Sequence, residues 1–161
     1  ALISLGAELI IQKRGQERRT PVETFYTGDG GKPHLLDKKE VVTAILIPPS
    51  GRGWREGFMK KSPRGSVDFA IASLSLRLKT NGKGIDDARI ALNSVSSKPI
   101  RARKTERYLK GKTISHPTVR EAVRLLLKES TPLSMVGASA LVRGHTIEAV
   151  FVDLIDMITD E

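Results

Sequence analysis

Charged residues cluster in the stretch MKKSPRGSVDFAIASLSLRLK, residues 59–79, just ahead of an alternating apolar segment. The cluster contains Lys60, Lys61, Arg64 and the single acid Asp68, and we call residues 60–71 the basic loop. Cations of this kind suit a phosphate or nucleic-acid partner, or simply a solvated surface. Asp68 could act as an acid, although the residues favour a structural role in which it accepts backbone N–H bonds at the turn.

Other residues with chemical potential do not form a recognisable motif. The histidines His34, His116 and His145 lie far apart without i+3 or i+4 partners, so we expect surface or capping roles rather than metal binding. GDGGKP at 28–33 lacks the Gly-Lys-Ser/Thr ending of a phosphate loop, and we interpret it as a turn. RARKTER at 101–107 could contact phosphates, but such runs are usually the solvated face of a short helix.

The composition limits the class of protein. The 161 residues suit one domain, or one domain plus a piece of another, and they carry a net charge of +9. No cysteine is present, which excludes disulfides and cysteine-bound clusters within this chain and is compatible with a reducing compartment. No apolar run approaches the roughly 20 residues that cross a bilayer, so no membrane partner is expected.

Strand periodicity predicts the elements that would position the basic loop. Apolar side chains at the even positions from Ala70 to Leu78 predict a half-buried strand. Short strands are expected in GFMKKS before it and ARIALNSV after it, with a turn at Asn81-Gly82. Short connections between three such strands indicate an antiparallel meander.

Helical periodicity follows the strands. Residues 101–111 predict a short helix that stops at Gly111, and residues 115–130 predict a helix capped by Ser115 or His116. Residues 137–158 show a third apolar stripe at helical spacing. The predicted fold class is therefore α+β, a three-stranded antiparallel sheet packed against about three helices.

The N-terminal part predicts strands of its own. AELIIQK and EVVTAILIPP are expected strands, the second closed by Pro48-Pro49, and a region rich in turn formers separates them. SGRGWREG, residues 50–57, is expected to be a linker. Because the chain starts in mid-pattern and without methionine, we expect a fragment of a longer polypeptide.

Five segments follow one another along the chain: ALISLGAEL, ETFYTGDG…LLDKKEVVTAILIPP, GFMKKSPRGSVDFAIAS, ARIALNSVSSKPIRARKTERYLKGK and GASALVRGHTI. This order of segments resembles the FAD-binding medium subunit of the xanthine dehydrogenase and carbon monoxide dehydrogenase family of molybdenum hydroxylases. The turn TGDGGKPHLL is longer than usual for the family and is similar to that of 4-hydroxybenzoyl-CoA reductase. Departures occur at Asn93-Ser94, where Gly-Gly is usual, at Leu141-Val142, where a tyrosine is common, and in the missing glycine-rich pyrophosphate loops.

The resemblance implies that residues 1–50 are the end of an FAD-binding domain and that residues 51–161 form the C-terminal α+β domain. It implies a cytoplasmic oxidoreductase subunit that exchanges electrons through FAD with a small iron–sulfur subunit and a large molybdenum-binding subunit. Without the pyrophosphate loops, the isolated piece is expected to bind FAD weakly and to be inactive.

The resemblance also implies cofactor-binding residues but no catalytic or metal-ligating ones. Val42 would pack against the isoalloxazine ring, and Lys60 would approach its polar edge and tune its potential. Lys61, Arg64 and Asp68 would shape the adjacent loop. The alternatives that stay open are a stand-alone nucleic-acid-binding module, which the scarcity of aromatic residues disfavours, and a structural assembly domain.

Overall fold

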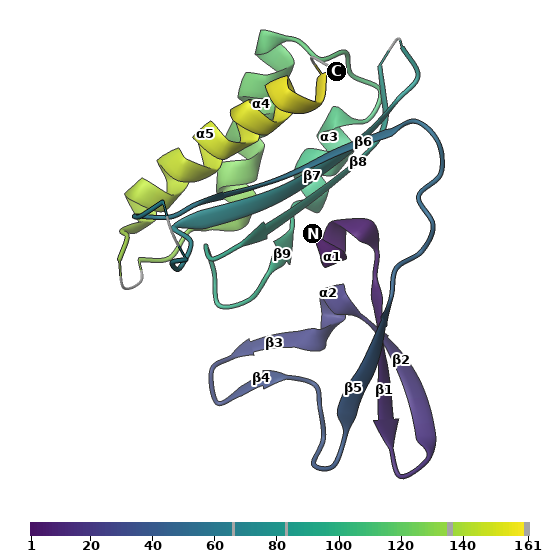
Figure 1. Cartoon of the computed structure of the whole chain (residues 1–161). Coiled ribbons are helices and arrows are strands. Elements are labelled where there is room, and N and C mark those ends of the chain that lie inside the picture. The colour runs from purple at the N-terminus through teal and green to yellow at the C-terminus, as the bar shows by residue number, and fades with distance from the viewer. Residues whose placement is uncertain (66, 83, 135–136, 160–161) are drawn as a thin grey trace.

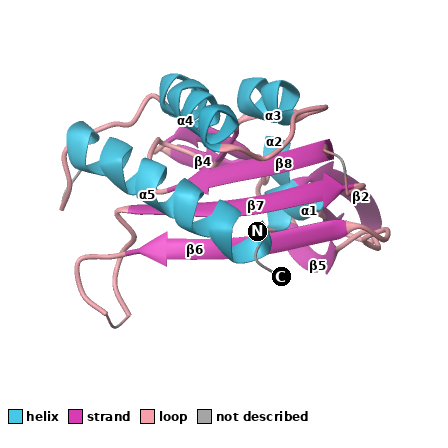
Figure 2. Ribbon diagram, turned by 90° about the horizontal axis from the view of Figure 1, so that it is seen from above, coloured by secondary structure: helices cyan, strands magenta, loops and turns pink. Residues whose placement is uncertain are grey.

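Three layers make up the computed structural model, which describes residues 1–65, 67–82, 84–134 and 137–159. Helices cover one face of a central antiparallel sheet, and the N-terminal elements lie against the other face (Figure 1). Seen from above, α4 and α5 lie across the strands (Figure 2). The predicted α+β class is confirmed.

The central sheet has the strand order β6-β7-β8-β9, with every neighbouring pair antiparallel. The three predicted strands are present, and the two-residue β9 extends the sheet beyond them. The predicted linker was partly wrong, because Trp54 to Gly57 pair with β7 as the start of β6. The strand bounds are Trp54–Lys61 for β6, Ala72–Thr80 for β7, Ile85–Asn93 for β8 and Ile100–Arg101 for β9.

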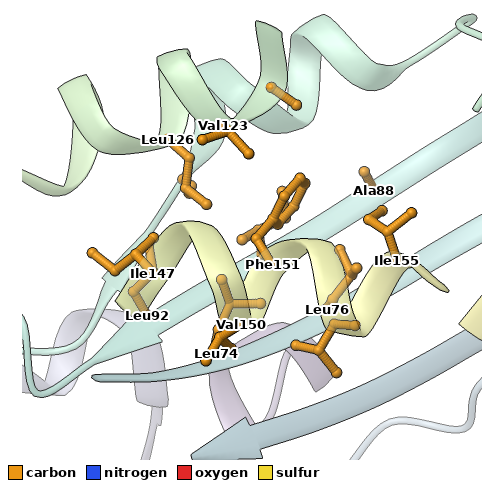
Figure 3. Packing of buried hydrophobic residues seen from close by; sticks show 14 of the residues in the cluster. Leu74, Leu76, Ala88, Leu92, Val123, Leu126, Ile147, Val150, Phe151 and Ile155 are labelled. Carbon is orange, nitrogen blue, oxygen red and sulfur yellow. The ribbon is translucent and has the colours of Figure 1, made fainter. Parts of the chain in front are cut away.

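The three predicted helices are confirmed as α3 (Arg103–Leu109), α4 (His116–Ser130) and α5 (Ala140–Thr159). The hydroxyl of Ser115 accepts the N–H of Thr118, so Ser115 is the N-cap of α4. Apolar side chains of α4, α5 and the sheet meet in the main hydrophobic core (Figure 3). Labelled members of this core are Leu74, Leu76, Leu92, Val123, Leu126, Ile147, Phe151 and Ile155.

Strand β7 is buried on both faces, although its alternation predicted a solvated polar side. Its even positions face the helices as expected. Its odd positions Ser73, Ser75 and Arg77 are each less than 7% exposed because the N-terminal elements cover them. The Ser4 and Ser75 hydroxyls lie 2.8 Å apart, and the small serine side chains let α1 approach the sheet closely.

The N-terminal elements have a hydrophobic core of their own. A three-stranded sheet has the order β2-β1-β5, and β3 pairs with β4 in a hairpin that turns at Gly30-Gly31, where the sequence predicted a turn. The element bounds are Leu2–Leu5 for α1, Glu8–Lys13 for β1, Gln16–Pro21 for β2, Val22–Phe25 for α2, Tyr26–Asp29 for β3, Lys32–His34 for β4 and Val41–Leu46 for β5.

Polar contacts fasten the N-terminal elements to the sheet. Arg77 donates to the carbonyl oxygen of Ser4 at 3.2 Å and to the Glu56 carboxylate at 2.6 Å. At the other edge, Arg103 forms a two-pronged hydrogen bond with the Glu23 carboxylate of α2. We call the region between α1, α2 and the sheet the seam. Within the described ranges, no helix is long and apolar enough to span a membrane.

Candidate functional site

The basic loop folds back on itself through Asp68. The Lys60 ammonium donates to the carbonyl oxygen of Asp68 at 3.2 Å, and Arg64 Nε donates to Asp68 Oδ2 at 2.9 Å. The N–H of Phe69 donates to the other carboxylate oxygen at 2.8 Å. The loop therefore gathers Lys60, Arg64 and Asp68 into one cluster.

Asp68 serves this cluster as a hydrogen-bond acceptor. The Arg64 hydrogen bond, then the Phe69 N–H and the charge of Lys60, hold the pKa of the Asp68 carboxyl below its usual range. A carboxylate that is ionised at neutral pH is a poor proton donor. The geometry therefore supports the structural role that the sequence favours for Asp68, in which its carboxylate accepts a backbone N–H bond.

Lys60 and Lys61 lie on opposite faces of β6. The Lys61 ammonium lies 3.5 Å from the Asp153 carboxylate of α5, so this side chain reaches the helical layer. Successive strand residues point to opposite faces, and Lys60 therefore lies on the face that carries Ser73, its partner in β7, and α1. Of the two lysines, Lys60 is the one on the seam side of the sheet.

A cavity of about 350 Å³ lies at the seam. Phe58, which is 56% exposed, lines it from the sheet, and Tyr26 lines it from the N-terminal elements. Ser73, Ser75 and Asn93 supply polar groups. Because Lys60 is two residues from Phe58 on the same strand, it lies on the same face, next along the strand.

Val42 is not part of this cluster. It lies in β5 opposite Ile11 of β1 and packs against the N-terminal core. Figure 1 shows β5 well separated from the loop that joins β6 to β7. The structure therefore brings three of the five predicted site residues together, Lys60, Arg64 and Asp68. Lys61 turns to the opposite face of β6, and Val42 lies in the N-terminal elements.

One buried charge was not singled out from the sequence. Arg143 of α5 is 2% exposed, and its guanidinium donates to the carbonyl oxygens of Ile71 and Ser94. The sequence pattern does indicate a buried charge here, because Arg143 is one turn before Ile147 and so lies on the apolar stripe of α5. A metal centre is not indicated, since no His, Cys, Asp and Glu side chains of the described residues gather to hold one.

Solved structures of two oxidoreductases have the same fold. Carbon monoxide dehydrogenase from Hydrogenophaga pseudoflava matches with a TM-score of 0.90 and 21% identity, covering 99% of this chain and 54% of that chain. Quinoline 2-oxidoreductase from Pseudomonas putida 86 matches with a TM-score of 0.86 and 24% identity, covering 99% and 54%. At these identities the matches establish the fold of the chain.

Curated relatives add sequence similarity. The glyceraldehyde dehydrogenase medium chain of Sulfolobus acidocaldarius is 28% identical over 149 residues, covering 91% of this chain and 51% of that protein. The carbon monoxide dehydrogenase medium chain of Hydrogenophaga pseudoflava is 26% identical over 122 residues, covering 74% and 41%. The chain thus spans about half the length of the curated relatives it matches.

The chain and these solved structures thus share one fold, in which a small N-terminal sheet is followed by an antiparallel sheet covered by helices. Residues 57–158, which span the sheet and its three helices, match the family described as the CO dehydrogenase flavoprotein C-terminal domain. The chain belongs to this family, and the resemblance noted from the sequence is confirmed.

The residues at the seam suit the ring end of a flavin. The exposed aromatic side chains of Phe58 and Tyr26 offer apolar contact to a planar ring, and Ser73 and Asn93 offer hydrogen bonds to its polar edge. Lys60 lies on the same face as these groups. The described residues fit the ring better than the phosphates, because GDGGKP forms a hairpin turn and not a phosphate loop.

Proposed function

We propose that this chain is the C-terminal part of the FAD-binding electron-transfer subunit of a multi-subunit molybdenum hydroxylase. In this proposal residues 1–50 belong to the FAD-binding domain, and residues 51–161 form the domain that caps the flavin and docks the partner subunits. The partners are an iron–sulfur small subunit and a molybdenum-binding large subunit, and the complex works in the cytoplasm. Family membership and the medium-chain relatives support this function.

The observation that carries the proposal is the placement of Lys60. Its side chain is on the seam face of β6, the face that also carries Phe58, while Lys61 is drawn to α5 by Asp153. The hydrogen bond from Lys60 to the Asp68 carbonyl, and the grip of Arg64 on the Asp68 carboxylate, limit where the ammonium can move. A fixed cation on the strand whose Phe58 lines the cavity, two residues further along, suits a ring that gains negative charge.

FAD, when bound, supplies two-electron and one-electron transfer. The chain's own contribution is electrostatic, because the Lys60 ammonium at the polar edge of the ring would stabilise negative charge there and raise the reduction potential. Phe58 and the apolar wall of the cavity would exclude water from that edge and so strengthen the effect. Arg64, Asp68 and Lys61 would hold the basic loop in the position that this requires.

The test uses the full-length subunit with Lys60→Ala. We expect the parent to show a flavin visible spectrum and the variant to have a midpoint potential lower by roughly 30 mV, or about 1.4 kcal/mol for a two-electron couple, because a stabilising charge is removed. Lys61→Ala, the neighbour on the opposite face, should shift the potential less. Lys128→Ala on the exposed side of α4 is the remote control and should leave it unchanged.

Two outcomes separate the parts of this proposal. A full-length subunit that is colourless and cannot be reconstituted with FAD would overturn the function. A coloured Lys60→Ala variant with the parent's potential would overturn the Lys60 assignment alone. The contact of Val42 with the ring stays a prediction, as does the inactivity of the isolated chain, and no comparison supports the nucleic-acid alternative.

A further inference from the structure

Arg143 is a buried charge that the proposed function does not yet use. It lies in the first turn of α5 on the same stripe as Ile147 and Phe151, both fully buried. Placing a guanidinium at a core position costs free energy unless polar groups surround it. Its partners therefore indicate what it does.

Those partners are the two chain segments that leave the sheet at one end. Arg143 Nη1 donates to the carbonyl oxygen of Ile71, the last residue of the basic loop, and to that of Ser94, which directly follows β8. The N–H of Ile71 in turn donates to the Lys61 carbonyl at 2.8 Å. One side chain thus closes the end of the sheet where the basic loop begins and ends.

We call the hydrogen bonds of Arg143 to Ile71 and Ser94 the clamp, and the backbone conformation of Ser94 gives a reason for it. Its φ of 64° lies in the left-handed region, which is unfavourable for a residue with a side chain. Such a conformation persists when surrounding contacts determine it. The hydrogen bond from Arg143 is a contact of that kind.

The charge of Arg143 is not neutralised by an acid in the described part of the chain. None of the ion pairs found there includes Arg143, and its buried Nε has no hydrogen-bond partner among the described atoms. Among the described residues, its hydrogen-bond acceptors are two backbone carbonyl oxygens. Its positive field therefore extends into the adjoining end of the sheet, where screening by water is weak.

We propose that Arg143 is a positioning residue that fixes the basic loop against the end of the sheet, and that its buried charge raises the positive potential near Lys60. This inference rests on the proposed function for the role of that potential. The clamp itself depends only on the contacts of Ile71 and Ser94.

The test compares Arg143→Met and Arg143→Lys in the full-length subunit. Two quantities are measured: the rate at which trypsin cleaves the native protein within the basic loop, and the midpoint potential of bound flavin. With Met, loop cleavage should rise about fivefold or more, because the two carbonyls lose their donor and the loop opens more often. The flavin potential should fall. Lys keeps the charge, so the potential should stay nearer the parent's while cleavage is intermediate.

The matched control is Ile147→Val, one turn further along the same stripe. It weakens the same helix through packing but leaves the clamp and its charge intact. The assignment is overturned if trypsin cleaves the basic loop of Arg143→Met no faster than that of Ile147→Val. It is also overturned if the flavin potential of Arg143→Met equals the parent's. A parent without flavin would overturn the proposed function instead, and the cleavage rates alone would then decide whether Arg143 holds the loop.

Discussion

At the scale of single residues, the ionisation of Asp68 holds the basic loop together. Hydrogen bonds from Arg64 and the Phe69 N–H, with the charge of Lys60, lower the pKa of its carboxyl in the folded chain. Because this pKa is below that of the unfolded chain, the ionised carboxyl stabilises the fold above the unfolded pKa. The contribution is lost as the pH falls through the folded-state pKa.

We therefore expect the Asp68 carboxyl to titrate below the usual aspartate range in a carbon-detected NMR titration. Arg64→Met should move its midpoint upward, since the largest cause of the lowered pKa is removed. A midpoint that does not respond to Arg64→Met would contradict the hydrogen-bonded arrangement. As a comparison within the same spectra, Glu40 is paired with Arg18, and its pKa is lowered to about 2.

The residue-level site was partly predictable. The charged cluster from Lys60 to Asp68 is visible in the sequence. Strand alternation also predicts that Lys60 and Lys61 lie on opposite faces of their strand. The apolar stripe of α5 predicts the helix but not the role of Arg143, a charged residue that lies on that stripe and is buried with it. The distance between Val42 and the basic loop could not be foreseen, since it depends on how two sheets are placed.

At the scale of elements, Gly57 lets α5 lie directly on β6. A Cβ atom built there would approach Met157 Cε to 2.5 Å and Leu154 Cδ2 to 2.7 Å. A side chain at this position therefore requires α5 to move or its side chains to repack. Gly57, the first residue of the predicted strand GFMKKS, thus marks a close approach of a helix to an edge strand.

Gly57→Ala should lower the free energy of unfolding by about 1–3 kcal/mol, because it overpacks the interface between β6 and α5. Chemical denaturation measures this change. Gly51→Ala is the matched control, since no atom lies within 4 Å of the Cβ it would add, and it should be neutral or slightly stabilising. Equal effects of the two substitutions would contradict the close packing.

The helices were more predictable than the strands. Ile147, Phe151 and Leu154 form a stripe whose period is local to the sequence, and all three are buried in the core as that period predicted. The odd face of β7 was not predictable in the same way. Its serines are polar, but the surface that covers them comes from α1, some seventy residues earlier in the chain.

At the scale of the whole molecule, Arg77 joins the two parts of the chain. It is 3% exposed and contacts Ser4 in α1, Ser50 in the connection and Glu56 in β6. Its guanidinium carbon also lies 4.6 Å from the ring centre of Trp54. Arg77 therefore helps to set how the N-terminal elements are placed on the sheet, together with the Arg103–Glu23 contact at the other edge.

Arg77→Met should lower the free energy of unfolding by about 1–3 kcal/mol, because it leaves the buried Ser4 carbonyl without this donor. It should also speed hydrogen exchange in α1 and β7 relative to α4. Arg89→Met is the comparison, since Arg89 lies opposite Arg77 in β8 and stacks on the same Trp54 ring at 5.4 Å. Uniform exchange changes throughout the chain would contradict a role for Arg77 at the seam.

The edge position of β6 has a consequence for how this region can change in evolution. Among the described residues only β7 pairs with β6, so a residue lost between Trp54 and Lys60 could be absorbed by sliding the strand one step. That slide would exchange the two lysines, turning Lys61 toward the seam and Lys60 toward α5. The number of residues in this segment should therefore vary less than their identity, because that number decides which lysine lies on the seam face.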